Sequence, residues 1–179
     1  MLRRIALTLT TLALLAMAAP AHAQGAATDR RQFGIGIGAN ASFDEPTTGA
    51  YPYEIYLPLR LSQALKIEPS IGLQTGSGDT DFTDLMLGVG VFAVRRVSAP
   101  VDLYYGGRLK LNFISEDDGV NDESGTDFYL TAAAGGEYFV VPAFSLGLEA
   151  NLGFYSLDEL SGDQDGLYTT GIFFLRMYL

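Results

Sequence analysis

Carboxylates are the most numerous chemically capable side chains in this 179-residue sequence, and they could act as acid–base groups or as ligands for hard cations. The sequence has 21 Asp and Glu residues against 11 Lys and Arg, which gives a formal net charge of −10. It has no Cys and a single His, His22. Without Cys there is no disulfide framework, no cysteine–zinc site and no cysteine nucleophile. The acidic balance argues against a nucleic-acid partner, which would require a basic surface.

Three acidic segments combine carboxylates with turn-forming residues, as calcium loops do. None of them completes the D-x-[DN]-x-[DN]-G-x5-E spacing. We therefore expect no resident metal or cofactor, and we interpret these acids as solvated loop residues. Calcium binding is the alternative. The segments are Asp79-Thr80-Asp81, Asp117-Asp118-Gly119 and Asp163-Gln164-Asp165-Gly166.

The first 23 residues have the layout of an export signal. A short basic segment ending at Arg4 precedes an almost wholly apolar run over residues 5–19, and Ala21-His22-Ala23 supplies the small-residue cleavage pattern. The apolar run is shorter than the roughly 20 residues that a membrane-spanning helix needs. We predict a cleaved signal peptide at residues 1–23.

Cleavage after Ala23 would leave a mature chain without His and with a net charge of −12. Such a chain lacks the usual general base near neutral pH and cannot use a Ser-His-Asp triad. Glu137 and Glu149 could still act as an acid–base pair. No substrate pocket accompanies them in the sequence, and we predict that the protein is not an enzyme.

Beyond a flexible lead at residues 24–31, every second residue is apolar in eight segments, which is the pattern of β-strands with two distinct faces. No segment of this region has the spacing of an amphipathic helix. We predict one domain over residues 32–179. Pro52, Pro58 and Pro69 each remove a backbone donor, so we expect bends or bulges in the second and third strands. The segments cover residues 33–43, 51–61, 65–73, 85–93, 101–113, 128–140, 144–154 and 171–179.

Short and long connections alternate between these segments. With eight strands, this places all long loops at one end of the sheet and both termini at the other, as in transmembrane barrels with short periplasmic turns. The predicted long loops, at residues 44–50, 76–84, 116–127 and 158–166, carry fifteen acids and no base. We predict an all-β fold, an eight-stranded antiparallel up-and-down transmembrane β-barrel. A soluble periplasmic lipocalin-like carrier, with its apolar face turned inward, is the alternative.

Aromatic residues lie near both ends of the apolar face, where a membrane barrel needs an interfacial girdle at each rim. The apolar face itself is nearly free of charge. The predicted girdle consists of Phe33, Phe43, Tyr51, Phe113, Phe128, Tyr138, Phe144 and Phe154.

The opposite face carries five acids and five bases. Because side chains fill the interior of an eight-stranded barrel, these charges must pair with one another. We predict a charge-paired plug, in which Glu149 lies near Arg176 and Arg60 lies diagonal to Glu68. A narrow gated ion channel, or small porin, is the alternative. The ten residues are Glu54, Arg60, Lys66, Glu68, Asp102, Arg108, Lys110, Glu137, Glu149 and Arg176.

The eight-strand pattern over residues 32–179 resembles the small outer-membrane barrels of the OmpA/OmpX type, the "outer membrane protein beta-barrel domain" group. The most similar stretch runs from Gly135-Gly136-Glu137-Tyr138-Phe139 to Phe144-Ser145-Leu146-Gly147-Leu148-Glu149-Ala150. The resemblance implies the outer membrane of a Gram-negative bacterium, insertion by the barrel-assembly machinery, contact with outer-membrane lipid and lipopolysaccharide, and a monomer with a structural or surface-interaction role. Divalent-cation bridges between the loop carboxylates and lipopolysaccharide phosphates are then a further alternative for the acidic segments. Members usually end in an aromatic residue, whereas this chain ends in Leu179 with Tyr178 before it.

Overall fold

The computed structural model describes residues 32–42, 53–78, 81–117, 119 and 122–179. The predicted signal peptide and the lead at residues 24–31 lie outside the described residues. None of the residues described belongs to a helix long and apolar enough to cross a membrane. The elements are β1 (Gly34–Ser42), β2 (Tyr53–Tyr56), β3 (Leu59–Arg60), β4 (Leu65–Gly76), β5 (Asp81–Ser98), β6 (Val101–Asp117), β7 (Asp122–Val141), β8 (Phe144–Ser156), the 3-10 helix η1 (Glu159–Ser161) and β9 (Asp165–Tyr178).

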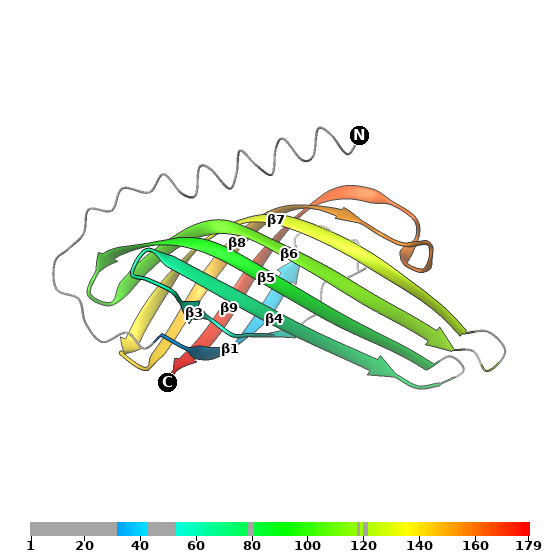
Figure 1. Cartoon of the computed structure of the whole chain (residues 1–179), viewed down its shortest axis with the longest axis horizontal. Helices are drawn as coiled ribbons and strands as arrows, with labels where there is room; N and C mark the ends of the chain where they lie inside the picture. Colours follow the sequence, from blue (N-terminus) through cyan, green and yellow to red (C-terminus); the bar gives the residue numbers. More distant parts are fainter. Residues whose placement is uncertain (1–31, 43–52, 79–80, 118, 120–121) are drawn as a thin grey trace.

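The strands close into a barrel through antiparallel pairing of each strand with its two neighbours (Figure 1). β2 and β3 follow one another along the same line and together form the second strand, between β1 and β4. β1 completes the circle by pairing with β9, where Ile37 lies opposite Leu175. The predicted eight-stranded antiparallel barrel is confirmed.

The short turns and the C-terminus lie at the same end of the barrel, which we call the turn end (left in Figure 1). Here the Leu179 N–H donates to the carbonyl of Phe33, and the Tyr178 N–H donates to the carbonyl of Ala143 in the turn between β7 and β8. The longer hairpin ends lie at the opposite end, which we call the loop end. The alternation of connection lengths predicted this separation.

Two prolines coincide with the break between β2 and β3. Pro58 lies in the break itself. The carbonyl of Pro69 on β4 accepts a hydrogen bond of 2.8 Å from the Leu57 N–H, so the donor that Pro69 lacks also faces this break. β4 continues through Pro69 without interruption, because the pairing with β5 at that residue uses no N–H of Pro69. The expected irregularity is therefore found in the second strand and not in the third; Pro52 lies outside the described residues.

The apolar face of the strands points out of the barrel. Ile37, Leu73 and Leu148 are 59%, 64% and 65% exposed, although burial would stabilise such side chains in a soluble protein. A lipocalin-type barrel would enclose this face, so the soluble-carrier alternative does not fit the structure. An apolar exterior around a polar interior is the arrangement that a lipid environment stabilises.

Six of the eight predicted girdle residues are described, and the structure places them in two groups on the outer surface. Phe33, Tyr138 and Phe144 lie toward the turn end. Phe113, Phe128 and Phe154 lie on the neighbouring strands β6, β7 and β8 toward the loop end. The positions of Phe43 and Tyr51 lie outside the described residues.

Three strands extend farther toward the loop end than the apolar alternation predicts. β5, β6 and β7 are 18, 17 and 20 residues long. Their outer parts contain acids that the sequence assigns to loops, and backbone pairing joins residues 81–84, 114–117 and 122–126 into one sheet. The expected loops at residues 76–84 and 116–127 are therefore too long. Strand pairing does not require apolar side chains, so it continues where the hydrophobic pattern stops.

Candidate functional site

The barrel interior contains the ten charged side chains of the inward face. Residues two apart on a strand share a face. Lys66 and Glu68 on β4 therefore both point into the barrel, as do Arg108 and Lys110 on β6. Nine of the ten residues are buried, and the side chain of Lys110 is 13% exposed. The interior is thus the most highly charged buried region that the described residues form.

Glu68 is the centre of the network, because three bases from three strands contact its carboxylate. Arg108 Nη2 on β6 lies 2.5 Å from Glu68 Oε1. Arg176 Nη2 on β9 lies 2.6 Å from Glu68 Oε2, and Lys66 Nζ lies 3.3 Å from the same oxygen. The two arginine contacts cross the lumen rather than joining adjacent strands, since β5 lies between β4 and β6 and the β4–β9 contact spans the barrel, whereas Lys66 lies on the same strand as Glu68.

Arg108 also holds Glu149 in a two-point contact. Its Nε and Nη2 donate to Glu149 Oε1 and Oε2, each at 2.8 Å. The Tyr104 hydroxyl donates to Glu149 Oε2 at 2.8 Å. Paired donors of this kind make the strongest protein ion pairs and fix the plane of the carboxylate.

The network continues from Arg176 toward the turn end through Glu137. Arg176 Nη1 lies 3.4 Å from Glu137 Oε2. Glu137 Oε1 accepts hydrogen bonds from the Ser145 hydroxyl at 2.6 Å and the Tyr178 hydroxyl at 2.7 Å. The carboxylate is thereby bound by groups from β8 and β9 in addition to the guanidinium.

Two arginines and one aspartate complete the turn end of the lumen. Arg60 Nη2 donates to Asp102 Oδ2 at 2.6 Å and lies 3.7 Å from Glu137 Oε2. Arg96, whose side chain is 41% exposed, lies 3.6 Å from Asp102 Oδ1. Ion pairs therefore connect Glu149 in mid-barrel to Arg96 at the rim.

A separate pair lies closer to the loop end. Lys110 Nζ contacts Glu54 Oε1, and Asn40 Nδ2 donates to the same oxygen at 3.1 Å. Every one of the ten predicted lumen charges therefore has at least one oppositely charged partner within the set.

The two pairs expected from the sequence are not the pairs that form. Glu149 lies opposite Ile172 on β9, four residues from Arg176, so the expected proximity of Glu149 and Arg176 is wrong. Arg60 lies opposite Lys66, which does make Glu68 its diagonal neighbour. Arg60 nevertheless turns to Asp102, because its long side chain reaches across the lumen.

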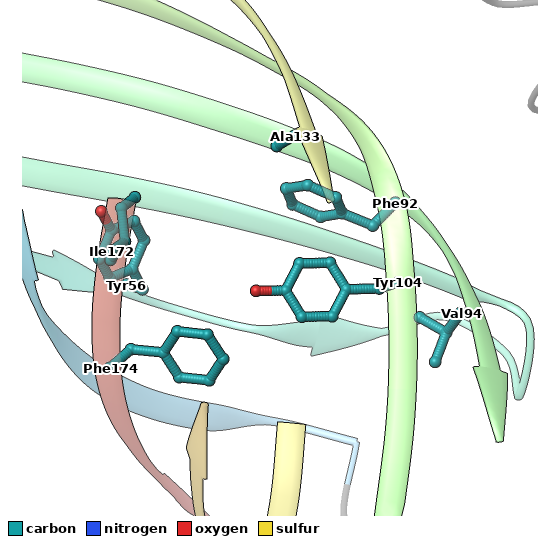
Figure 2. Close-up of a cluster of buried hydrophobic side chains, with 7 residues drawn as sticks. All are labelled: Tyr56, Phe92, Val94, Tyr104, Ala133, Ile172 and Phe174. Carbon is teal, nitrogen blue, oxygen red and sulfur yellow. The ribbon is translucent and has the colours of Figure 1, made fainter. Parts of the chain in front are cut away.

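Aromatic rings project into the lumen together with these charges, and Figure 2 shows the rings. Phe92, Tyr104 and Phe174 come from β5, β6 and β9 and project into the same part of the lumen, with 5.2 Å between the ring centroids of Phe92 and Tyr104. Lys66 Nζ lies 3.9 Å from the Tyr104 centroid, and Arg176 Cζ lies 3.6 Å from that of Phe174. Cations at such distances are attracted to the ring faces. The rings therefore form a buried apolar cluster inside the barrel and stabilise the buried cations.

The loop end of the lumen is closed by the segment between β8 and β9. Leu157 of this segment is 6% exposed and packs against Met86 and Tyr129. Asp127, which is 1% exposed, accepts hydrogen bonds from the Asp158 N–H and from the Ser161 hydroxyl, both at 2.9 Å. Sequence reasoning assigned Asp127 to a loop. Asp127 lies ten residues before Glu137 on β7, so the two side chains share one face of the strand. This spacing could have predicted that Asp127 points into the barrel.

A comparison with protein families agrees with this fold. The profile of the family described as "Outer membrane protein beta-barrel domain" matches residues 9–174. The chain belongs to this family. No curated protein sequence matches the chain significantly.

Two solved outer-membrane structures show the same fold. Neisserial surface protein A (NspA) is 19% identical, with a TM-score of 0.56 over 83% of this chain and 97% of that chain. Ail, the attachment invasion locus protein of Yersinia pestis in complex with the heparin analogue sucrose octasulfate, is 14% identical, with a TM-score of 0.55 over 82% of this chain and 95% of that chain. At these identities the likeness extends to the barrel fold alone.

The candidate calcium ligands that the structure describes do not gather into one site. Among the described residues, no group of three or more His, Cys, Asp or Glu side chains could hold a metal ion. Asp81 on β5 and Asp117 on β6 do lie opposite each other, and each accepts a hydrogen bond from a nearby backbone N–H. Asp163 and Asp165 lie after η1, whereas Asp79 and Asp118 lie outside the described residues.

The two carboxylates considered as an acid–base pair, Glu137 and Glu149, lie on adjacent strands at diagonal positions. Each is buried and engaged by a different guanidinium, Glu137 by Arg176 and Glu149 by Arg108. Acid–base chemistry requires access to a substrate, and the contacts that these two groups make are with other side chains of the lumen.

Proposed function

We propose that this outer-membrane barrel is a non-conducting, non-catalytic protein with a structural or surface-interaction role, and that its lumen is a charge-paired plug. The observation that carries the proposal is the pairing of the ten predicted lumen charges with one another. An ion would have to separate these pairs, and breaking a buried pair by removing one partner costs about 3–5 kcal/mol. The aromatic rings around Tyr104 fill the space that an open channel would need.

Planar-bilayer recording tests the plug. We expect the purified, heat-modifiable barrel to insert without steady conductance, since open aqueous channels are typical of barrels with about 16 or more strands. A steady conductance that Arg176→Ala or Glu149→Ala abolishes would instead favour the narrow gated channel. Arg96→Ala, which changes a partly exposed charge at the rim, serves as the control.

The loop end supports a surface role that is selective for charge. The sequence places fifteen acids and no base in the four predicted loops and their flanks. Ail was crystallised with a polysulfated sugar. An acidic surface repels such a ligand, so we infer that partners of this chain are cationic or are bridged by divalent cations.

A heparin-binding assay checks this inference. We expect no retention of the detergent-solubilised barrel on heparin beads at about 0.15 M salt, where the Debye length is roughly 8 Å. Retention on beads coated with a polycation such as polylysine, lost at high salt, is the expected counterpart. Binding to heparin and not to polylysine would contradict the proposed selectivity.

We further propose that residues 1–23 are removed on export, that the barrel-assembly machinery inserts the mature chain, and that the barrel works as a monomer in contact with lipopolysaccharide. The basic, apolar and small-residue segments in order support cleavage, and a closed barrel without open edges supports a monomer. The intact mass of protein purified from the outer membrane tests the cleavage site.

A further inference from the structure

The outer surface near the turn end carries one basic side chain, Arg95, among the described residues. Arg95 lies opposite Leu103, which is 47% exposed to the outside. Residues that face one another across an antiparallel pair share a face, so Arg95 points out of the barrel. The next residue, Arg96, lies opposite the buried Asp102 and contacts it from the lumen side. The side chains of these two consecutive arginines therefore lie on opposite faces of β5.

Arg95 lies at the edge of the apolar belt. It is three residues before the end of β5 and follows the exposed apolar residues Val89 and Val91 along the same face. Tyr105, which is 50% exposed, is its diagonal neighbour on β6. An arginine and a tyrosine at this depth are suited to the headgroup region, where long cationic side chains extend toward water and tyrosine lies at the interface.

The surroundings of Arg95 leave its charge available to an external anion. Among the described residues no acid forms an ion pair with Arg95, and the acids nearest this end, Asp102 and Glu137, are 1% exposed and paired inside the lumen. The other outward acids of the strands lie toward the loop end, as Asp81 and Asp117 do. Among the residues that the structure describes, the outward charge near the turn end is therefore that of Arg95, whereas the outward charges near the loop end are acidic.

We propose that Arg95, with the Tyr105 hydroxyl as a second donor, binds the phosphate of an anionic phospholipid in the periplasmic leaflet. A guanidinium can donate two parallel hydrogen bonds to a phosphate, and the phenol can donate a third. The exposed apolar side chains beside Arg95 would contact the acyl chains of the same lipid. The proposal rests on the membrane placement of the family and on the orientation that the alternating connection lengths predict, with the short turns toward the periplasm.

Native mass spectrometry of the detergent-released barrel tests this site by titration with phosphatidylglycerol and, separately, with phosphatidylcholine. We expect phosphatidylglycerol to bind more tightly. Arg95→Gln should weaken its binding about five-fold, which corresponds to about 1 kcal/mol for one basic residue near an anionic surface. Tyr105→Phe, which keeps the ring, should cause a smaller loss. Arg96→Gln is the matched control, because it removes the same charge from the adjacent residue on the opposite face and should leave the lipid preference unchanged.

Equal losses in Arg95→Gln and Arg96→Gln would show a general charge effect and overturn the proposal, as would the absence of any preference for phosphatidylglycerol. Titration with purified lipopolysaccharide separates the two leaflets. Arg95-dependent competition by lipopolysaccharide would assign the phosphate to the outer leaflet and contradict the site as proposed. Lipid binding is measured without reference to conductance, so failure of this proposal and failure of the plug would be seen in different experiments.

Discussion

Arg176→Met should destabilise the barrel by about 3–5 kcal/mol, the cost typical of removing one partner from a buried ion pair. Arg176 is 1% exposed and joins the two carboxylates at the centre of the lumen, Glu68 and Glu137. Met preserves much of the side-chain volume, so the loss would report the missing charge rather than a large cavity. Glu68 would keep Lys66 and Arg108, whereas Glu137 would retain Arg60 at 3.7 Å and its two hydroxyl donors.

Urea unfolding in detergent micelles, followed by circular dichroism and by the heat-modifiable gel shift, measures this effect. Arg96→Met is the matched control, because its partly exposed pair with Asp102 should contribute no more than about 1 kcal/mol. A double-mutant cycle sharpens the test: Glu137→Gln should cost less in the Arg176→Met background than in the wild type, because neutralising Glu137 removes a carboxylate that has lost its nearest guanidinium. Equal stability of Arg176→Met and wild type would contradict the plug.

The inward direction of the lumen charges was predictable because it depends only on the two-residue period of a strand. Glu149 and Arg176 were correctly placed on the inner face, and the identity of their partners was not. Pairing inside the barrel depends on the stagger between strands and on the reach of side chains across the lumen. Arg108 on β6 contacts Glu68 on β4, although β5 lies between these two strands. The pairing of adjacent strands therefore does not predict this contact.

The apolar belt of the strands was also predictable, because the apolar alternation marks it. Pro58 likewise marks the break within the second strand. The polar extensions of β5, β6 and β7 were not, because backbone pairing beyond the belt leaves no hydrophobic period in the sequence. The two-residue period gives the inward direction of Asp127 but not its burial. Its burial depends on the segment after β8 folding over it, which is a tertiary contact rather than a property of β7.

Asp127→Ala should release the segment at residues 157–164 from the loop end of the barrel. The Asp127 carboxylate accepts from the Asp158 N–H and the Ser161 hydroxyl, and both donors would lose their partner. Leaving such donors unsatisfied costs about 2 kcal/mol, equivalent to about a 30-fold increase in the open population of the segment. Strand pairing at β8 and β9 does not depend on Asp127, so the global unfolding midpoint should fall much less than in Arg176→Met.

Limited proteolysis with a glutamate-specific protease measures this opening, because Glu159 lies within η1 and its cleavage requires the segment to leave its folded conformation. The rate of cleavage after Glu159 should rise about 30-fold in Asp127→Ala when opening is fast relative to cleavage. Glu123→Gln is the control, since it removes an exposed acid from the same strand without touching the segment. If cleavage after Glu159 were equally slow in Asp127→Ala, Leu157 packed against Met86 and Tyr129 would be sufficient to hold the segment, and the buried carboxylate would have no part in closing the barrel.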